Sequence, residues 1–366
     1  MRQLQAGLPG KIDIPELIME IRRRIAQQEG QPLIEKAMFA VVNNRRLFHS
    51  ILRTASVTQA PFARDGFIRH LPMFLSKLTD FRSLPAIADV PFRDRIKKID
   101  QPKSQEKVAF YSGCLIDFAY PGMGEALVKI FNKAGIEVVF PEAQTCCGAP
   151  ARYSGAYEVA AQNAADNIKA LTEADASYVV SACPTCTAAL KYEFIKTFES
   201  LGREELISEA NELSAKTMDF SSLVKKLVDE GRLAFKNARQ LTKLTYHDSC
   251  HLKRTLNVFE EPRELLKKAG YEIVEMFESD ICCGMGGSYS LKLPEISSPI
   301  LERKLKNIRE TGASVVAMDC PGCVMQIRGG FDKEGTPLSV QHTVELLAEM
   351  LEQGCRSMPE CRCVPS

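Results

Sequence analysis

The chain has 366 residues, of which 45% are hydrophobic and 25% charged, and these values are typical of globular proteins. Its 47 Lys and Arg residues nearly balance 46 Asp and Glu, so a net charge of +1 argues against a nucleic-acid binder. No apolar run reaches the roughly 20 residues of a membrane-spanning helix, and MRQLQAGLPG lacks a signal peptide's apolar stretch, so we expect a cytoplasmic protein.

Residues 1–106 form a basic segment without cysteine. They contain 18 Lys and Arg against 11 Asp and Glu, whereas the remaining 260 residues contain 29 against 35. Apolar residues at helical spacing predict amphipathic helices at 15–28 and 45–55, and residues 66–78 are apolar with scattered basic side chains. Such an arm either packs on the rest of the chain or binds a partner. As a partner, another subunit fits better than a membrane surface. Residues 101–106 have the composition of a linker.

The thirteen cysteines all lie after residue 107. In a cytosolic chain they indicate metal ligation or redox chemistry rather than disulfides, because glutathione keeps thiols reduced. Ten of them form two sets with one order: a single Cys, a Cys-Cys-Gly and a Cys-Pro-x-Cys. Matched cysteines are 136 or 137 residues apart, which indicates a duplicated module. The two sets are Cys114, Cys146, Cys147, Cys183 and Cys186, and Cys250, Cys282, Cys283, Cys320 and Cys323.

Both sets are embedded in the same pattern of predicted elements. Buried strands are predicted at 107–113, 136–140, 177–182, 243–249, 271–277 and 314–319. Helices are predicted at 124–134, 156–173, 262–269 and 294–310. This alternation predicts two parallel α/β units whose cysteines follow the carboxyl ends of strands, where open sheets bind ligands. Pro184 and Pro321 suit the first turn of a helix, whose N–H groups would face the thiolates.

The segment between the modules, residues 187–242, contains no proline and predicts helices at 189–201 and 221–235. We therefore expect a helical insert packed on the α/β cores. The expected domains are a basic helical arm with its linker (1–106), the first module with the insert (107–242), the second module (243–353) and a tail (354–366).

Five cysteines per module exceed the four that a zinc ion or a conventional iron–sulfur cluster requires. A site with a Cys-Cys pair can hold an irregular cluster in which one thiolate bridges two irons. Zinc is the alternative for either module.

The two C…CCG…CPxC units resemble the cysteine-rich, or CCG, domains of the heterodisulfide reductase family. They resemble more closely the related iron–sulfur subunits of lactate and glycolate oxidation systems. The likeness spans about residues 107–351 and includes FYSGCLIDFAYPG and YHDSCHLKR. It implies a cofactor held by the ten repeat cysteines, often a noncubane [4Fe-4S] cluster, in one or both modules, with zinc as the alternative in one of them.

The resemblance also implies a function, that of an iron–sulfur subunit relaying electrons from 2-hydroxy acid oxidation (lactate or glycolate) towards a quinone or another carrier. Flavin- or ferredoxin-bearing subunits are the expected partners, since neither GxGxxG after a strand nor a CxxCxxCxxxCP run occurs. Residues 7–25 resemble the stretch after the last Cys-Pro of a two-cluster ferredoxin in longer relatives, but Leu8-Pro9 stands there. Either a separate subunit supplies that ferredoxin, or the chain is a truncated or split form.

One expectation about location and two alternative functions complete these predictions. The chain is expected to associate with the inner face of the membrane only through such a complex, if at all. A disulfide or heterodisulfide reductase acting at the second module is the rival enzyme. The alternative that is not an enzyme is a zinc-stabilised interaction module without a redox role.

Polar residues around the second set have two interpretations. In the first interpretation, His247 and His251 donate hydrogen bonds to a cluster, ligate zinc or protonate a thiolate. In the second, they are ordinary polar residues of a loop. The glycine-rich stretch 284–287 follows the second Cys-Cys pair, whereas the stiffer Gly-Ala-Pro follows the first. This difference predicts that the second site is the more accessible one. No catalytic residue is assigned. Three further cysteines lie in the tail and have no expected role: Cys355, Cys361 and Cys363.

Overall fold

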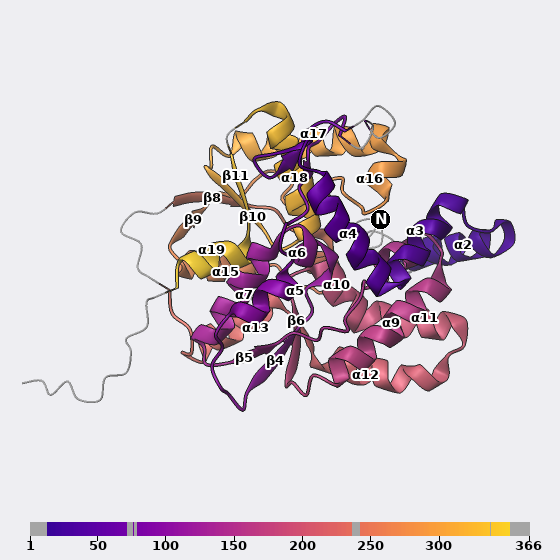
Figure 1. Cartoon of the computed structure of the whole chain (residues 1–366). Coiled ribbons are helices and arrows are strands. Elements are labelled where there is room, and N and C mark those ends of the chain that lie inside the picture. Colours follow the sequence, from indigo (N-terminus) through magenta and orange to yellow (C-terminus); the bar gives the residue numbers. More distant parts are fainter. Residues whose placement is uncertain (1–12, 72–75, 77–78, 236–241, 337, 352–366) are drawn as a thin grey trace, which may run out of the picture.

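Two four-stranded parallel sheets form the body of the molecule (Figure 1). The computed structural model describes residues 13–71, 76, 79–235, 242–336 and 338–351. The strand orders are β5-β4-β6-β7 and β9-β8-β10-β11, so the two sheets share one topology, as predicted for a duplicated module. The strands are β4 (Lys107–Phe110), β5 (Glu137–Val139), β6 (Tyr178–Ser181), β7 (Thr217–Asp219), β8 (Thr242–Tyr246), β9 (Tyr271–Ile273), β10 (Val315–Met318) and β11 (Ser339–His342).

The central strands are short and apolar. β4 reads KVAF, β6 reads YVVS and β10 reads VVAM, and the last three residues of each are buried. Strands buried on both faces are typical of parallel sheets that helices cover on either side. All six predicted strands are present, and each is shorter than predicted. β4, β6, β8 and β10 end before the cysteine that follows them because the chain leaves the sheet there.

The fourth strand of each sheet was not predicted. β7 lies within residues 187–242, for which only helices were expected, and it pairs with β6 in parallel. Its three residues, Thr-Met-Asp, are too few to show an alternating pattern. β11 pairs in the same way with β10 in the second sheet. The segment between the modules is therefore helical but also completes the first sheet.

Six helices recur in the same order in both halves, and the first half has α11 (Phe194–Leu201) and α12 (Ile207–Lys216) in addition. Those of the first half that recur are α6 (Gly113–Phe118), α7 (Pro121–Lys133), α8 (Ala149–Tyr153), α9 (Tyr157–Thr172), α10 (Pro184–Ala188) and α13 (Phe220–Asp229). A π-helical turn, η3 (Ala189–Glu193), joins α10 to α11, and a 3-10 turn, η4 (Glu204–Leu206), precedes α12. Those of the second half are α14 (Cys250–Thr255), α15 (Glu261–Lys268), α16 (Tyr289–Lys292), α17 (Pro294–Glu310), α18 (Pro321–Glu334) and α19 (Thr343–Glu349).

The two halves are joined by contacts between equivalent elements. α13 of the first half packs against α15 of the second, and α19 of the second packs against α7 of the first. Because α13 corresponds to α19 and α7 to α15, the halves are related by an approximate two-fold axis. One apolar core runs through both, and it includes Phe131, Leu265 and Leu347. At the joint, His342 Nε2 lies 2.8 Å from the carbonyl oxygen of Ala182.

The N-terminal arm contains α2 (Ile14–Glu29), α3 (Leu33–Asn43) and α4 (Arg45–Thr58), which confirms the helices predicted at 15–28 and 45–55. Three short antiparallel strands follow, β1 (Ala63–Arg64), β2 (Phe67–Ile68) and β3 (Leu84–Pro85), and then α5 (Phe92–Arg95) and the 3-10 turn η2 (Ile96–Lys98). Of the apolar stretch 66–78, residues 67 and 68 are therefore strand, and residues 72–75, 77 and 78 lie outside the described part.

The arm packs on its own body and contacts both halves. Glu16 pairs with Arg152 of α8 at 2.5 Å, and Arg69 pairs with Asp332 of α18 at 2.7 Å. Leu33 and Ile34 at the start of α3 nevertheless remain about four-fifths exposed. Packing on the body, one of the two roles expected for this arm, is thus confirmed.

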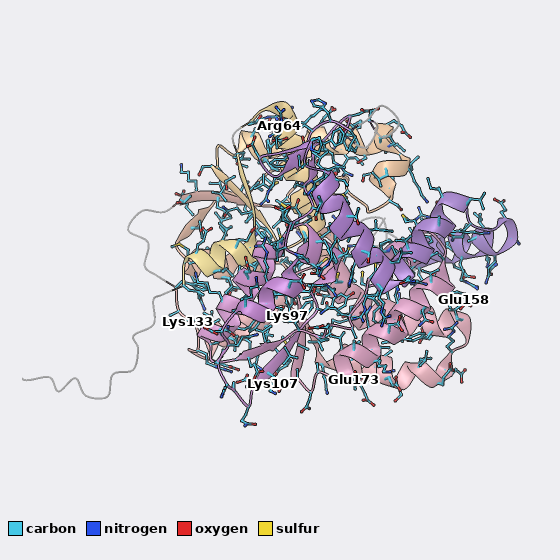
Figure 2. The ribbon with its side chains drawn as sticks, in the orientation of Figure 1. Arg64, Lys97, Lys107, Lys133, Glu158 and Glu173 are labelled. Atoms are coloured by element: carbon cyan, nitrogen blue, oxygen red, sulfur yellow. The ribbon has the colours of Figure 1, made fainter. Side chains whose placement is uncertain are left out.

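The outer surface carries the charged side chains. Lys133, Glu158 and Glu173 are among the exposed charged residues of the first half (Figure 2). Among the described helices, none has the length together with the apolar character that crossing a membrane requires.

Candidate metal centre

The cysteines of both sets lie just beyond the carboxyl ends of the strands, as predicted. Cys183 follows β6 and precedes α10, and Cys320 stands in the same place between β10 and α18. Pro184 and Pro321 are the first residues of these helices, where the missing proline N–H costs nothing. The Cys-Cys pairs lie on the loops that follow β5 and β9.

In the first set, Cys147 is the central sulfur. It accepts hydrogen bonds from the thiols of Cys146 and Cys186, and these bonds hold its pKa well below the ordinary value. Cys186 passes so close to Gly113 that a Cβ atom at that glycine would lie 2.7 Å from its Sγ. Gly113 also has a φ of +64°, a conformation that disfavours other residues. The glycine therefore makes room for the sulfur ligands.

The second set converges in the same way. The sulfurs of Cys283 and Cys323 are 3.4 Å apart, and the N–H of Gly284 donates to Cys282 Sγ at 3.3 Å. Hydrogen bonds from Cys250 and Cys283 lower the pKa of Cys282 to about 2. This side chain is exposed, but so is that of Cys114 in the first set, so exposure does not distinguish the two sites, although the glycine-rich loop predicts a more accessible second site.

The two sets meet, a feature that the sequence did not predict. Cys183 and Cys320 are close enough for each to shift the pKa of the other, which makes the sulfurs of the two modules neighbours. At the far end of the first set, Cys114 interacts electrostatically with Cys147. Thiol contacts run in the order Cys146, Cys147, Cys186, Cys183, Cys320, Cys323, Cys283, Cys282 and Cys250.

The donor set fits a thiophilic metal. All ten cysteines are reduced, five sulfurs converge in each module, and soft thiolates favour iron–sulfur clusters or zinc over hard cations. Buried thiols packed this closely also disfavour simultaneous ionisation, and burial together with neighbouring thiols raises the pKa of Cys186 and Cys323 well above the ordinary value. A bound metal would displace these protons and neutralise the thiolates.

Of the two candidate histidines, His247 lies beside the sulfurs of the second set and His251 lies between the two modules. His247 is buried, and its Nδ1 lies 3.2 Å from the Ser279 carbonyl oxygen, while its Nε2 has no partner among the described residues. One of its ring nitrogens and the sulfurs of Cys283 and Cys323 all lie within 4.8 Å of one another, which could hold a metal ion. Burial lowers the pKa of His247 to about 4, so the ring is neutral at pH 7 and able to ligate.

His251 instead lies at the joint between the modules. Its Nε2 is 3.0 Å from the hydroxyl of Tyr153, and its Nδ1 is 3.3 Å from Thr185 Oγ1 and 3.7 Å from Cys250 Sγ. Tyr153 in turn donates to the buried carboxylate of Glu193 at 2.6 Å. The tail cysteines Cys355, Cys361 and Cys363 lie outside the described residues.

Two buried cations beside the second set were missed by the sequence analysis. Arg82 comes from the N-terminal arm, and Lys304 comes from α17; each is 1% exposed. Arg82 lies in an ordinary basic and apolar stretch, so no local pattern marks it. Lys304 could have been noticed, because the matching residue of the first module is the neutral Asn167.

Gly113→Ala tests the fit around Cys186. We expect the variant to lose metal from the first set and to be less stable than Gly202→Ala, because only at Gly113 would the new Cβ meet a sulfur. Gly202 has a similar φ of +67° with nothing within 4 Å, so both variants share a left-handed strain of about 1–2 kcal/mol. Metal content and thermal unfolding are the measurements, and equal values for the two variants would contradict the expected contact.

Comparison with known proteins gives two kinds of match. The model of the cysteine-rich domain family CCG matches residues 108–191 and 244–328, one copy in each half. Lactate utilization protein A 1 from Bacillus mycoides is 37% identical over 250 residues, which cover 68% of this chain and 99% of that protein. Lactate utilization protein A from Geobacillus thermodenitrificans is 38% identical over 243 residues, or 66% and 98% of the two chains.

Among solved structures, glutamate racemase from Francisella tularensis aligns with 67% of this chain and 78% of its own, at 12% identity and a TM-score of 0.29. This likeness is too weak to support an inference.

Proposed function

Because the chain belongs to the lactate utilization protein A family and folds into two cysteine-rich modules, we propose that it is an iron–sulfur electron-transfer subunit of a lactate-oxidising complex. In this role it passes electrons from a 2-hydroxy acid, lactate or glycolate, towards a quinone or another carrier. Its proposed partners are flavin- or ferredoxin-bearing redox subunits. Its proposed place is the cytoplasm, at the inner face of the membrane when the complex docks there.

The observation that carries the proposal is the unbroken row of sulfurs. Each module offers five cysteines as ligands, and we propose a noncubane [4Fe-4S] cluster in both, with zinc in one module as the alternative. An iron–sulfur cluster, when bound, supplies one-electron chemistry. The proximity of Cys183 and Cys320 brings the two ligand sets together, and clusters held by them would allow electrons to pass between the modules.

Other residues of the chain hold these ligands in place. Asn167 accepts from the N–H of Thr145 and donates to the carbonyl of Cys146, which fixes the loop of the first Cys-Cys pair. Lys304 donates to the carbonyls of Glu278 and Ser279 before the second pair. The apolar core below both loops excludes water, which strengthens every interaction with charge at the sulfurs.

The first test is the content of iron, acid-labile sulfide and zinc, together with EPR, on protein purified without oxygen. We expect about four to eight irons per chain, with matching sulfide and the signal of an unusual cluster. Two zinc ions without sulfide would contradict electron transfer and favour a zinc-stabilised interaction module, for which His247, Cys283 and Cys323 supply a ready ligand group.

One observation favours a second function, disulfide reduction at the second module. Cys282 is the exposed thiol of that set, and a glycine-rich loop follows it. A viologen-coupled assay with a heterodisulfide distinguishes the two functions. Turnover by protein that contains its cluster supports the reductase, whereas no turnover with an intact cluster speaks against it.

A further inference from the structure

Arg82 is a buried cation without a carboxylate partner. Its Nη2 donates to Ser290 Oγ at 3.0 Å and its Nη1 to Met285 Sδ at 3.1 Å, while Nε has no partner among the described residues. An isolated charge inside a protein is strongly unfavourable, so a buried arginine needs an anion nearby. Met285 stands two residues after Cys283, which places the guanidinium beside the second sulfur set. Burial lowers the pKa of Arg82 to about 10, and the Cys283 thiol acts in the opposite direction.

The arm is built to hold this arginine in place. The strand β3 packs against α18, and the arm's strand segment lies beside α17 and α18 in Figure 1. Next to Arg82, the N–H of Ser83 donates to the carbonyl of Gly329 at 3.0 Å. A Cβ at Gly329 would lie 2.1 Å from the carbonyl oxygen of Ser83, so only glycine permits this approach. The backbone contact fixes where the guanidinium enters the second module.

Lys304 is the second buried cation at this site. Its ammonium donates to two backbone carbonyls, and neither it nor Arg82 forms an ion pair with a carboxylate within the described part of the chain. In the first module Asn167 fixes the equivalent loop without a charge. Holding the loop therefore does not require a cation, and the positive charge of Lys304 has another role.

The first module has no equivalent excess of positive charge. Arg93, which lies near Cys114, pairs with the buried carboxylate of Asp117 at 2.6 Å, and Arg152 pairs with Glu16. Tyr111 occupies the place of His247 and donates its hydroxyl to the carbonyl of Thr145 at 2.5 Å. The cations around the first set are thus neutralised by carboxylates.

Acidic residues beside the second set reduce this difference in charge between the two sites. Asp319 precedes Cys320, where the first module has Ala182. Its carboxyl accepts a hydrogen bond from the Ser221 hydroxyl at 2.6 Å. Asp248 and Asp280 also lie beside the second set, but they pair with Arg263 at 2.7 Å and with Arg254 at 3.0 Å. Among these three carboxyls only Asp319 lacks an ion pair within the described residues, and it faces two cations, so the second site remains the more positive of the two.

We propose that Arg82 and Lys304 make the second module the more oxidising site, so that electrons move from the first module to the second. This inference rests on the proposed function. A positive charge near a cluster stabilises its reduced form, which carries one more negative charge. One electron would pass between clusters held on either side of Cys183 and Cys320, and no bond would form or break. The electron comes from the flavin- or ferredoxin-bearing partner and leaves from the second module towards the quinone or other carrier.

The test is a redox titration followed by EPR on the whole chain, with Arg82→Gln and Lys304→Asn. We expect each variant to lower the equilibrium constant for reducing the second cluster about tenfold, or about 59 mV for a one-electron couple. The first cluster should keep its potential. Arg82→Lys should restore most of the shift, since it retains the charge. Lys304→Asn keeps the test open if Arg82→Gln does not fold, because Asn already holds the equivalent loop of the first module.

Arg69→Gln is the matched control. It removes another arginine of the same arm, one that pairs with Asp332 on α18 but lies away from the sulfurs, and should move neither potential. Two clusters whose potentials do not respond to Arg82→Gln and Lys304→Asn overturn this inference alone. A shift of the first cluster instead of the second overturns it as well. Wild-type protein without iron and sulfide overturns the proposed function, and the inference with it.

Discussion

Cys147→Ser is expected to lose the cluster of the first module and to retain that of the second. Cys147 is the sulfur on which two other thiols of its set converge, and serine is a poor ligand for iron. Iron and sulfide should fall to about half, and electron transfer from the donor subunit to the carrier should stop because the first half of the row is broken.

Cys283→Ser is the reciprocal variant, since Cys283 has the matching place in the second set. It should also halve the iron content, but the EPR signal it loses should be the one that Cys147→Ser keeps. Cys361→Ser, in the tail to which no role is assigned, should retain all of the iron. If Cys147→Ser and Cys283→Ser each lost all of the iron, the two modules would not bind clusters independently.

Arg263→Met is expected to be the most destabilising single substitution outside the cysteines. Arg263 is buried and donates to Asp248 at 2.7 and 3.0 Å and to Glu275 at 2.7 and 3.0 Å. Removing one partner of a buried pair costs about 3–5 kcal/mol, because the remaining charge stays buried. Asp248 would keep only the partly exposed Lys253, 3.4 Å away, as a counter-charge. Since Asp248 also accepts from Ser279 at 2.9 Å, the loop leading to the second Cys-Cys pair should loosen at the same time.

Denaturant unfolding measures this effect, and Lys306→Met is its control. Lys306 pairs with Glu310 at 3.7 Å on the surface, and its loss should change the free energy of unfolding by no more than about 0.5 kcal/mol. A loss of less than about 1 kcal/mol for Arg263→Met would show that Asp248 and Glu275 find other partners once the arginine is gone.

The sequence predicted well what depends on local pattern. Runs such as SYVVSA mark buried strands, and the repeated spacing of the cysteines places each of them at the end of such a strand. Both features follow from periodicity and from the rule that open sheets bind ligands at their carboxyl ends. The two parallel sheets and the position of Pro184 and Pro321 were accordingly correct.

What the sequence did not reveal depends on contacts between distant residues. β7 is three residues long and becomes a strand because β6 offers it an edge, not because of its own composition. Arg82 and Met285 are 203 residues apart, and no pattern in either segment indicates their contact. The meeting of Cys183 and Cys320 likewise results from how the two halves pack.

The approximate two-fold axis has a consequence for how the two sites came to differ. Equivalent helices exchange equivalent contacts across the joint, α13 with α15 and α19 with α7, which is the geometry of an isologous homodimer. Two identical protomers would build the same joint, but every replacement in one site would appear in the other. Fusion into one chain lifts that restriction. Tyr111 and Asn167 in one half can then coexist with His247 and Lys304 in the other, and a symmetric pair of sites becomes a path with a direction.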